Sequence, residues 1–453
     1  PSLTLGCGSY GHNSVSDNVS AVNLLNIKKI GKRRNNMQWF KVPSKIYFER
    51  DSIEYLHSMR DVERVFIVTD RSMVDLGYVT RVTDQLEQRR NKVQVQLFCD
   101  VEPDPSIQTV KKGLSLMQAF RPDTIIAIGG GSSMDAAKGM WLFYEQPDVN
   151  FDDLKQKFMD IRKRAFRYPE LGKKSKLVCI PTTSGTGSEV TPFAVITDKE
   201  ENKKYPLTDY SLTPTVAIVD PALTMSLPAS ITADTGMDVL CHALEAYVSR
   251  AASDFSDALA EKVVQQVFRY LPTCWRSGDN LLAREKMHNA SCMAGMAFTN
   301  ASLGITHSLA HALGGVFRVP HGRANALLMA HVVAWNADVD GQCDTLAAHK
   351  YARLAHLLDL PAASPRQGVA SLLVAIQALK EEMSLPAGIS DTGIEAAEFD
   401  RRLPEMVGQA LRDSCTPTNP RTPDANALTE LYRQAWHGQQ TSPGGAPLAR
   451  AYG

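Results

Sequence analysis

The sequence predicts an α/β domain built on a mostly parallel sheet, followed by an all-helical domain. From Met37 on, short β-branched runs alternate with polar stretches of helix length, which is typical of βαβ units around a buried parallel sheet. After Pro228 these runs stop, and long stretches rich in Ala, Leu and Met follow. A chain of 453 residues is also too long for one ordinary core, so two domains are expected.

Each predicted strand is a short apolar run, and the runs are Val65–Val68, Val93–Phe98, Thr124–Ile128, Leu177–Ile180 and Val216–Val219. Beyond them, apolar residues recur at helical spacing, as in Ser256–Tyr270 and Ala283–Ala297. We place the boundary near residue 226, with the α/β domain over 37–226 and the helical domain over 227–453. A Pro-punctuated loop is expected over 415–423 and a loose tail after Gly438.

Residues 1–36 differ from both domains in composition. They are rich in Gly, Ser and Asn and end close to the basic run Lys32-Arg33-Arg34, so we expect a linker or arm. The first residue is Pro rather than Met, which favours a chain that is processed or cut from something longer.

The composition limits the classes of partner. Lys+Arg and Asp+Glu balance at 49 each, so the net charge does not favour nucleic acid, and a small-molecule ligand fits better. No run of about 18 apolar residues predicts a membrane span. The eight cysteines are scattered without a CxxC pair, which favours reduced thiols and a cytoplasmic location.

Two polar loops follow predicted strands. Gly129-Gly130-Gly131-Ser132 joins a strand to a helix that begins near Met134, and such a loop lets backbone N–H groups approach a pyrophosphate. Taken alone, it is equally well explained as a tight βα turn. The second loop, 181–189, carries five hydroxyls and two glycines after its strand. Two such loops at the carboxyl ends of sheet strands favour a nucleotide crevice.

Asp70 closes the strand Val65–Val68. Its carboxylate could accept from both ribose hydroxyls and repel a 2′-phosphate, which would favour NAD over NADP. A helix cap or turn residue explains the same position equally well.

Histidines and an aspartate recur at metal-ligand spacing in the second half. Asp238 and His242 are four residues apart in the predicted helix Thr235–Arg250, so their Cβ atoms lie about 5–6 Å apart on one face. His307 and His311 repeat this spacing in a helix over 306–313. We expect Gly314-Gly315 to terminate that helix.

His321 follows in the predicted turn 319–322 and completes the set. Any one of these histidines alone is more often a capped or core residue, but together they favour a metal site. One carboxylate with imidazoles and no thiolate suits Fe(II), Zn(II), Mn(II) or Co(II), and geometry alone does not choose among them.

These motifs resemble a known family. Gly304-x-x-His307-x-x-Ala310-His311-x-x-Gly314 with Pro320-His321-Gly322, and Val219-Asp220-Pro221 with Asp238-x-x-x-His242-x-x-Glu245, are similar to the signature of the iron-containing (group III) alcohol dehydrogenases. The resemblance covers about residues 37–435 and implies the dehydroquinate-synthase-like architecture, with an NAD-binding first domain and a metal-binding second one. It is closest to the alcohol dehydrogenase half of bifunctional aldehyde/alcohol dehydrogenases, so 1–36 resembles the linker from an aldehyde dehydrogenase half.

The resemblance implies a set of functional residues. The metal ligands fall on Asp238, His242, His307 and His321, while His311 stays off the metal near the nicotinamide. The cofactor positions are Asp70, Gly130, Gly131, Ser132, Asp135, Thr182, Thr183, Thr186 and Lys204. The substrate channel is lined by Thr191, Phe193, Val195, Phe298 and Cys415. Asp104 departs from the Asn of many relatives and is left out of the site.

The implied reaction is the reversible reduction of a short aldehyde, acetaldehyde to ethanol as in ethanol fermentation, by NADH. The metal, Fe(II) first and Zn(II) second, would act as a Lewis acid, and His311 would relay the proton. The resemblance also implies a homo-oligomer, which forms a filament in the parent protein. Three alternatives are a zinc polyol dehydrogenase, a dehydroquinate-synthase-like lyase and a chiefly structural role in the filament. The lyase would need several basic residues near the metal, where we find mainly Arg318 and Arg323.

Overall fold

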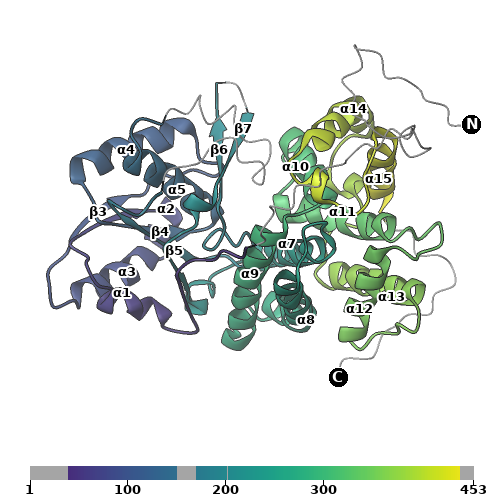
Figure 1. Cartoon of the computed structure of the whole chain (residues 1–453), viewed down its shortest axis with the longest axis horizontal. Helices are drawn as coiled ribbons and strands as arrows, with labels where there is room; N and C mark the ends of the chain where they lie inside the picture. The colour runs from purple at the N-terminus through teal and green to yellow at the C-terminus, as the bar shows by residue number, and fades with distance from the viewer. Residues whose placement is uncertain (1–38, 150–169, 201–202, 439–453) are drawn as a thin grey trace, which may run out of the picture. The chain divides into compact units, whose positions relative to one another are not determined.

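Six parallel strands form the main sheet in the computed structural model of the chain (Figure 1). In spatial order they are β1 (Lys45–Phe48), β8 (Val216–Val219), β5 (Lys176–Pro181), β4 (Thr124–Gly129), β2 (Arg64–Val68) and β3 (Gln94–Phe98). Five match the predicted runs. The edge strand β1 was not predicted, because its apolar run is only three residues long and the strand is half-buried or exposed.

The structure describes residues 39–149, 170–200 and 203–438, without the side chains of 203–205. The predicted linker 1–36 and the tail after Gly438 therefore lie outside the described residues. From Phe40 on, the described residues form one compact unit. Among them, no helix is long and apolar enough to cross a membrane, and all seven cysteines are free thiols.

The central strands are apolar throughout because helices cover both faces of the sheet, with α4 and α5 on one face and α1 and α3 on the other (Figure 1). These helices are α1 (Tyr55–Ser58), α3 (Tyr78–Glu87), α4 (Ile107–Phe120) and α5 (Gly131–Glu145). Successive β4 residues alternate between the two cores: Ile125 packs in the core under α4 and α5, and Ile126 in the core under α1 and α3. The fully buried β4 therefore anchors both layers.

A second, antiparallel sheet was not predicted. It is the pair β6 (Phe193–Asp198) and β7 (Lys203–Thr208), in which Phe193 lies opposite Thr208. Ala194 and Ile196 of β6 are buried in the core shared with α5. This pair is not hydrogen-bonded to the main sheet. The main sheet is parallel, as predicted.

The second half of the described chain is helical, as predicted. Its helices are α7 (Ala229–Val248), α8 (Asp254–Arg276), α9 (Leu281–Ala301), α10 (Ile305–Phe317), α11 (His321–Asn336), α12 (Leu346–Leu357), α13 (Pro365–Glu382), α14 (Ala396–Arg412) and α15 (Ala425–His437). One core joins α7, α8, α9 and α11 to α12 and α13, and a second joins α10 and α11 to α14 and α15. The predicted loop around 415–423 lies between α14 and α15.

Two local predictions near the histidines were wrong. Gly314-Gly315 does not end α10, which continues to Phe317 and is terminated by Arg318 in the left-handed region at φ 57°. The Arg318 N–H donates to Gly314 O at 2.9 Å, so a non-glycine residue takes the usual glycine position of the C-cap. His321 is not in a turn but is the first residue of α11, with Pro320 at the N-cap.

Lys138 on α5 joins the main sheet to the segment that leads into β6. Its side chain is fully buried, and its Nζ donates to three backbone carbonyls, those of Ser188 at 2.7 Å, Thr191 at 2.8 Å and Phe193 at 2.8 Å. Burial lowers the pKa of Lys138, and the charge of Asp135, one turn earlier, opposes that shift. Three carbonyls saturate the three ammonium donors, so this one side chain sets the path of 188–193.

We predict that Lys138→Met lowers the free energy of unfolding by about 3–5 kcal/mol, because three buried carbonyls lose their donor and Asp135 loses its neighbouring charge. Urea unfolding followed by circular dichroism measures the change. The matched control is Lys112→Met on α4, where the lysine is 61% exposed and should change stability by no more than about 0.5 kcal/mol. Equal stabilities for the two variants would contradict the role of Lys138.

Candidate active site

The carboxyl ends of β2, β4 and β5, here called the nucleotide edge, bring the predicted cofactor loops together. β2 lies between β3 and β4 in the sheet. The next strand in the chain, β3, pairs on one side of β2, and the strand after that, β4, pairs on the other side, so the strand order reverses at β2. Such a reversal is a topological switch point. A Cβ placed on Gly130 would lie 3.7 Å from Thr183, and one on Gly131 would lie 3.1 Å from Thr186. The glycine loop and the hydroxyl-rich loop therefore lie against each other.

The glycine loop prepares a helix N-terminus for an anion. Gly129 has φ 143°, a backbone conformation that other residues rarely adopt, and a Cβ there would also collide with Ser133. Helix α5 then starts at Gly131, with Gly130 as an N-cap that has no side chain to cap it. The first N–H groups of α5 are thus uncapped by side chains, as phosphate binding requires. The helix begins earlier than the sequence analysis placed it.

Two further predicted cofactor residues border this edge. Thr182 donates its N–H to Gly129 O at 2.9 Å, and the Ser132 hydroxyl accepts from the Asp104 N–H at 3.3 Å. Lys204 lies in β7, but its side chain lies outside the described residues.

Asp70 follows β2 and uses its two oxygens differently. Oδ1 caps helix α2 (Arg71–Asp75), accepting from the N–H of Ser72 at 2.9 Å and of Met73 at 3.3 Å. Oδ2 lies 3.3 Å from the hydroxyl of Ser133, next to the glycine loop. The capping interpretation thus describes one oxygen, and the other remains placed for a ligand at the nucleotide edge.

Asp135 links the nucleotide edge to the predicted substrate channel. Its Oδ1 accepts from the Ser188 hydroxyl at 3.0 Å and its Oδ2 from the Val195 N–H at 2.9 Å. Both partners hold the start of β6 in place. The carboxylate therefore connects α5 to β6 and to the segment before it.

The predicted channel residues lie in three places. Phe193 on β6 stacks on Phe298 of α9, with ring centroids 6.1 Å apart, and Phe298 stacks on His242 at 4.4 Å. Thr191 is buried in the segment held by Lys138, and Cys415 lies beside His311 behind α10. The aromatic pair connects β6 to the histidines.

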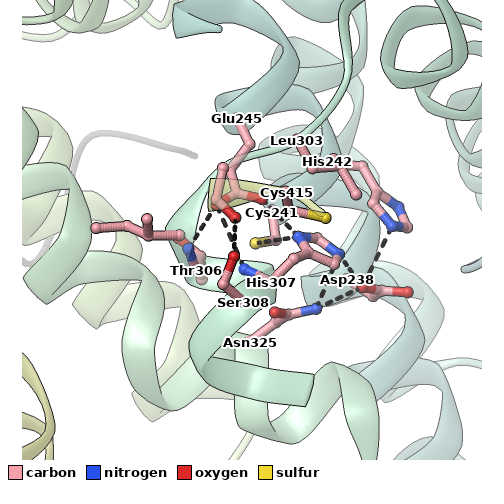
Figure 2. A network of polar contacts seen from close by, with 12 residues as sticks. Asp238, Cys241, His242, Glu245, Leu303, Thr306, His307, Ser308, Asn325 and Cys415 are labelled. Atoms are coloured by element: carbon pink, nitrogen blue, oxygen red, sulfur yellow. Dashed lines mark hydrogen bonds and ion pairs between the residues drawn. The ribbon is translucent and has the colours of Figure 1, made fainter. Parts of the chain in front are cut away.

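The four predicted ligands converge from three helices. Figure 2 shows three of them, Asp238, His242 and His307. Asp238 and His242 come from α7, His307 from α10 and His321 from α11. The Nε2 atoms lie 3.6 Å (His242), 3.6 Å (His307) and 3.5 Å (His321) from Asp238 Oδ1. Ligands of one small divalent ion in tetrahedral geometry are about 3.4 Å apart, so this spacing fits. We call these four residues the ligand cluster.

Asn325, which the sequence analysis did not select, points its amide into the ligand cluster. It lies one turn after His321, and its Nδ2 is 2.8 Å from Asp238 Oδ1 and 3.2 Å from Nε2 of both His307 and His321. Within the described residues its Oδ1 is buried and accepts no hydrogen bond. An N–H donor and a cation satisfy the same lone pairs, so these contacts mark a centre that attracts positive charge. The donor set thus fits a divalent ion.

Burial and charge prepare the cluster for a cation. Although burial alone would raise it, the rings of His242, His321 and His307 hold the pKa of Asp238 far below its ordinary range. Burial lowers the pKa of His242 to about 4, so at neutral pH its ring is uncharged and keeps the lone pair that a metal needs.

Glu245 orients the His307 ring by a hydrogen bond to Nδ1, the ring nitrogen that does not face the ligand cluster. Its Oε2 lies 2.5 Å from His307 Nδ1, and its Oε1 accepts the Thr306 N–H at 2.7 Å (Figure 2). Although burial opposes it, the charge and hydrogen bond of His307 keep the pKa of Glu245 below its ordinary value. With Nδ1–H donated to this carboxylate, the lone pair of Nε2 faces the cluster. Glu245 belongs to the family motif that contains Asp238 and His242, but no role was predicted for it.

His311 lies beside the ligand cluster but outside it. Its Nδ1 is 2.9 Å from Asp413 Oδ2, its ring centroid is 5.4 Å from that of His321, and its side chain is 44% exposed. Asp413 was not selected from the sequence either, since nothing in the spacing connects it to a histidine 102 residues earlier.

A glycine loop at the switch point of a parallel sheet, beside helices that gather one carboxylate and three imidazoles, defines the class of nucleotide-linked, metal-dependent dehydrogenases. Residues 43–221 match the model of iron-containing alcohol dehydrogenases, and residues 232–436 match the C-terminal model of the Fe-containing alcohol dehydrogenase family. The chain belongs to the iron-containing alcohol dehydrogenase family.

Individual relatives agree with this assignment. The chain is 57% identical over 451 residues to an aldehyde-alcohol dehydrogenase of Streptococcus pneumoniae, covering 98% of this chain but only 51% of that protein. It is 40% identical to an NADPH-dependent butanol dehydrogenase of Clostridium saccharobutylicum, covering 89% and 99%. A solved 1,3-propanediol oxidoreductase shares the fold with a TM-score of 0.80 and 31% identity, covering 88% and 100%.

The comparisons confirm the predicted fold class and the predicted reaction class. The chain is an oxidoreductase of the iron-containing alcohol dehydrogenase family. It spans about half the length of the bifunctional relatives, at 51% of the Streptococcus pneumoniae protein.

Glu245→Gln should weaken divalent-metal binding by about 10–100-fold, because a neutral amide supports the His307 ring less well than a carboxylate does. Competition between the metal-free protein and a colorimetric chelator for Zn²⁺ measures the affinity.

The control for this variant is Glu145→Gln, another buried glutamate, which accepts backbone N–H groups of 173–175 at the far end of α5. Its metal affinity should equal that of the unmodified protein. If both variants bound Zn²⁺ equally well, Glu245 would have only a structural role at the start of α10.

Proposed function

We propose that this chain reduces short-chain aldehydes reversibly with NADH, acetaldehyde to ethanol being the main reaction. The observation that supports this most is the ligand cluster itself, with Phe298 stacked between His242 and Phe193 of β6. The aromatic pair places an apolar surface beside the ligand cluster, which suits a small aliphatic substrate.

We propose Fe(II) as the metal, with Zn(II) second. One carboxylate, three imidazoles and no thiolate form a donor set suited to such borderline ions, and the family is named for iron. When bound, the ion supplies a Lewis acid for the carbonyl oxygen of the aldehyde.

The protein's own residues hold and orient the reactants in this proposal. The first N–H groups of α5 bind the pyrophosphate, and Asp70 Oδ2 accepts from a ribose hydroxyl. The threonines of the loop after β5, with Lys204, complete the cofactor site. Phe193 and Phe298 exclude water from the reacting atoms, and His311 carries the proton between the product oxygen and solvent.

The arrangement of charge disfavours the lyase alternative. A phosphorylated, carboxylated substrate needs unpaired cations near the metal, but Arg323 pairs with Asp234 through two contacts of 3.1 Å each. The zinc polyol dehydrogenase differs from the present proposal only in substrate and metal, so an assay must separate them.

We further propose that the chain functions as the alcohol dehydrogenase half of a bifunctional protein, as the names of its long relatives suggest. In such a protein, residues 1–36 would link it to an aldehyde dehydrogenase half, and a homo-oligomeric filament would pass acetaldehyde between the two. The free cysteine thiols support the cytoplasmic location predicted from the sequence.

A panel of aldehydes and diols assayed with metal-reconstituted protein tests the function. We expect NADH oxidation to be fastest with acetaldehyde and other short aliphatic aldehydes, to stop on chelation, and to return with Fe²⁺. His307→Ala should lose both the metal and the activity while keeping its circular dichroism spectrum. Higher kcat/KM for polyols, or full activity without metal, would overturn the proposal.

Asp70→Gly should raise the ratio of kcat/KM for NADPH to that for NADH, because the charge that would repel a 2′-phosphate is removed. Steady-state kinetics with both cofactors measures this ratio. The test matters because the butanol dehydrogenase relative is NADPH-dependent by name.

Asp424→Gly is the matched control, since it removes an aspartate N-cap of α15 that lies outside the nucleotide edge. Both variants should lose only a few tenths of a kcal/mol of stability, because glycine is itself a tolerated N-cap residue. If Asp70→Gly changed the cofactor ratio no more than Asp424→Gly did, capping would be the whole role of Asp70.

A further inference from the structure

Helix α10 carries two histidines one turn apart, and each has a different carboxylate behind it. His307 Nδ1 contacts Glu245, which comes from α7, and His311 Nδ1 contacts Asp413, which directly follows α14. The two rings have the same kind of partner on the same nitrogen. Only His307 lies in the ligand cluster. The two histidines therefore differ in where their carboxylate partner holds the ring.

The carboxylate of Asp413 is itself held firmly. Its Oδ1 accepts the Cys415 N–H at 2.8 Å and lies 3.2 Å from the Ser308 hydroxyl. The side chain is only 18% exposed. Thr416 fastens the same loop, because its hydroxyl lies 2.6 Å from Ala410 O and 2.8 Å from Ser308 Oγ. Asp413 is therefore a fixed anchor rather than a mobile surface carboxylate.

The ring of His311 lies next to two rings of the ligand cluster. Its centroid is 5.9 Å from that of His307 and 5.4 Å from that of His321. A neutral imidazole at this distance from a divalent ion is a strong competing ligand unless something restrains it. Among the described residues, the contact that holds a His311 ring nitrogen is the 2.9 Å hydrogen bond to Asp413.

We propose that Asp413 is a positioning residue that keeps His311 out of the metal's ligand set and leaves its Nε2 available as a proton relay. The inference rests on the proposed function, since it requires a divalent ion held by the ligand cluster. It assigns Asp413 no contact with substrate or cofactor. Its action is exerted through His311.

A second metal site is the competing interpretation of the same residues. His311, Asp413 and Cys415 offer ligand atoms within 4.8 Å of one another. However, His311 is exposed and the other two residues are half-buried, whereas three of the four residues of the ligand cluster are buried. Asp413 Oδ1 is also already held by the Cys415 N–H and the Ser308 hydroxyl. The hydrogen-bonded arrangement favours positioning.

Cobalt(II) substitution tests the proposal, because the visible absorption of cobalt(II) reports its coordination number. The 453-residue chain and its Asp413→Ala variant are loaded with Co²⁺. We expect one cobalt per chain in both, with weaker and shifted bands in the variant because His311 adds to the ion. The double variant Asp413→Ala/His311→Ala should regain the original spectrum.

Kinetics provides a second readout. Asp413→Ala and His311→Ala should each lower kcat by about 10²-fold, and the double variant should be no worse, since both changes remove the same relay. Asp413→Asn keeps one oxygen that can accept from His311, so its spectrum and kcat should be closer to those of the unmodified protein. Thr416→Val, which loosens the same loop without touching Asp413, should keep the original spectrum.

The outcomes separate the two proposals. If Asp413→Ala kept both the cobalt spectrum and kcat, or if the unmodified chain bound two cobalt ions and lost one with Asp413→Ala, positioning by Asp413 would be refuted while the proposed function stood. If His307→Ala changed neither the cobalt stoichiometry nor the spectrum, the ligand cluster and hence both proposals would fail.

Discussion

The carboxylate of Asp238 is the charge on which the helical half depends. It is 3% exposed, and burying an unpaired carboxylate costs several kcal/mol, so the fold must surround it with compensating groups. Rings from α7, α10 and α11 and the amide of Asn325 provide them. Meeting this one requirement brings three helices to a common point, and that point is the candidate metal site.

Helix α9 joins this point to the nucleotide edge. His288 contacts the Ser184 hydroxyl at 3.0 Å, Gly295 lies so close to Gly187 that neither tolerates a Cβ, and Phe298 stacks on His242. All three contacts are made by residues of the same helix, α9. In the proposed function, a helix that touches both the hydroxyl-rich loop and the ligand cluster would hold a hydride donor and an acceptor at a fixed separation.

Local patterns in the sequence were sufficient for five of the six strands of the main sheet and for the four residues of the ligand cluster. Buried β-branched runs identified the central strands, because a strand covered on both faces is apolar throughout. The four-residue spacing of Asp238 and His242 placed both on one helix face. The family motifs then assigned His307 and His321 to the metal and His311 to a position off it, a distinction that spacing alone could not make.

Only the tertiary structure decided which groups stand behind those residues. Glu245 and His307 are 62 residues apart, Asp413 and His311 are 102 apart, and Asn325 and Asp238 are 87 apart, so no local pattern connects the partners. The β6–β7 pair and the exchange of a glycine C-cap for Arg318 were likewise set by packing. A sequence records which side chains can ligate or relay, but the orientation of each depends on a hydrogen-bond partner brought from a distant helix by folding.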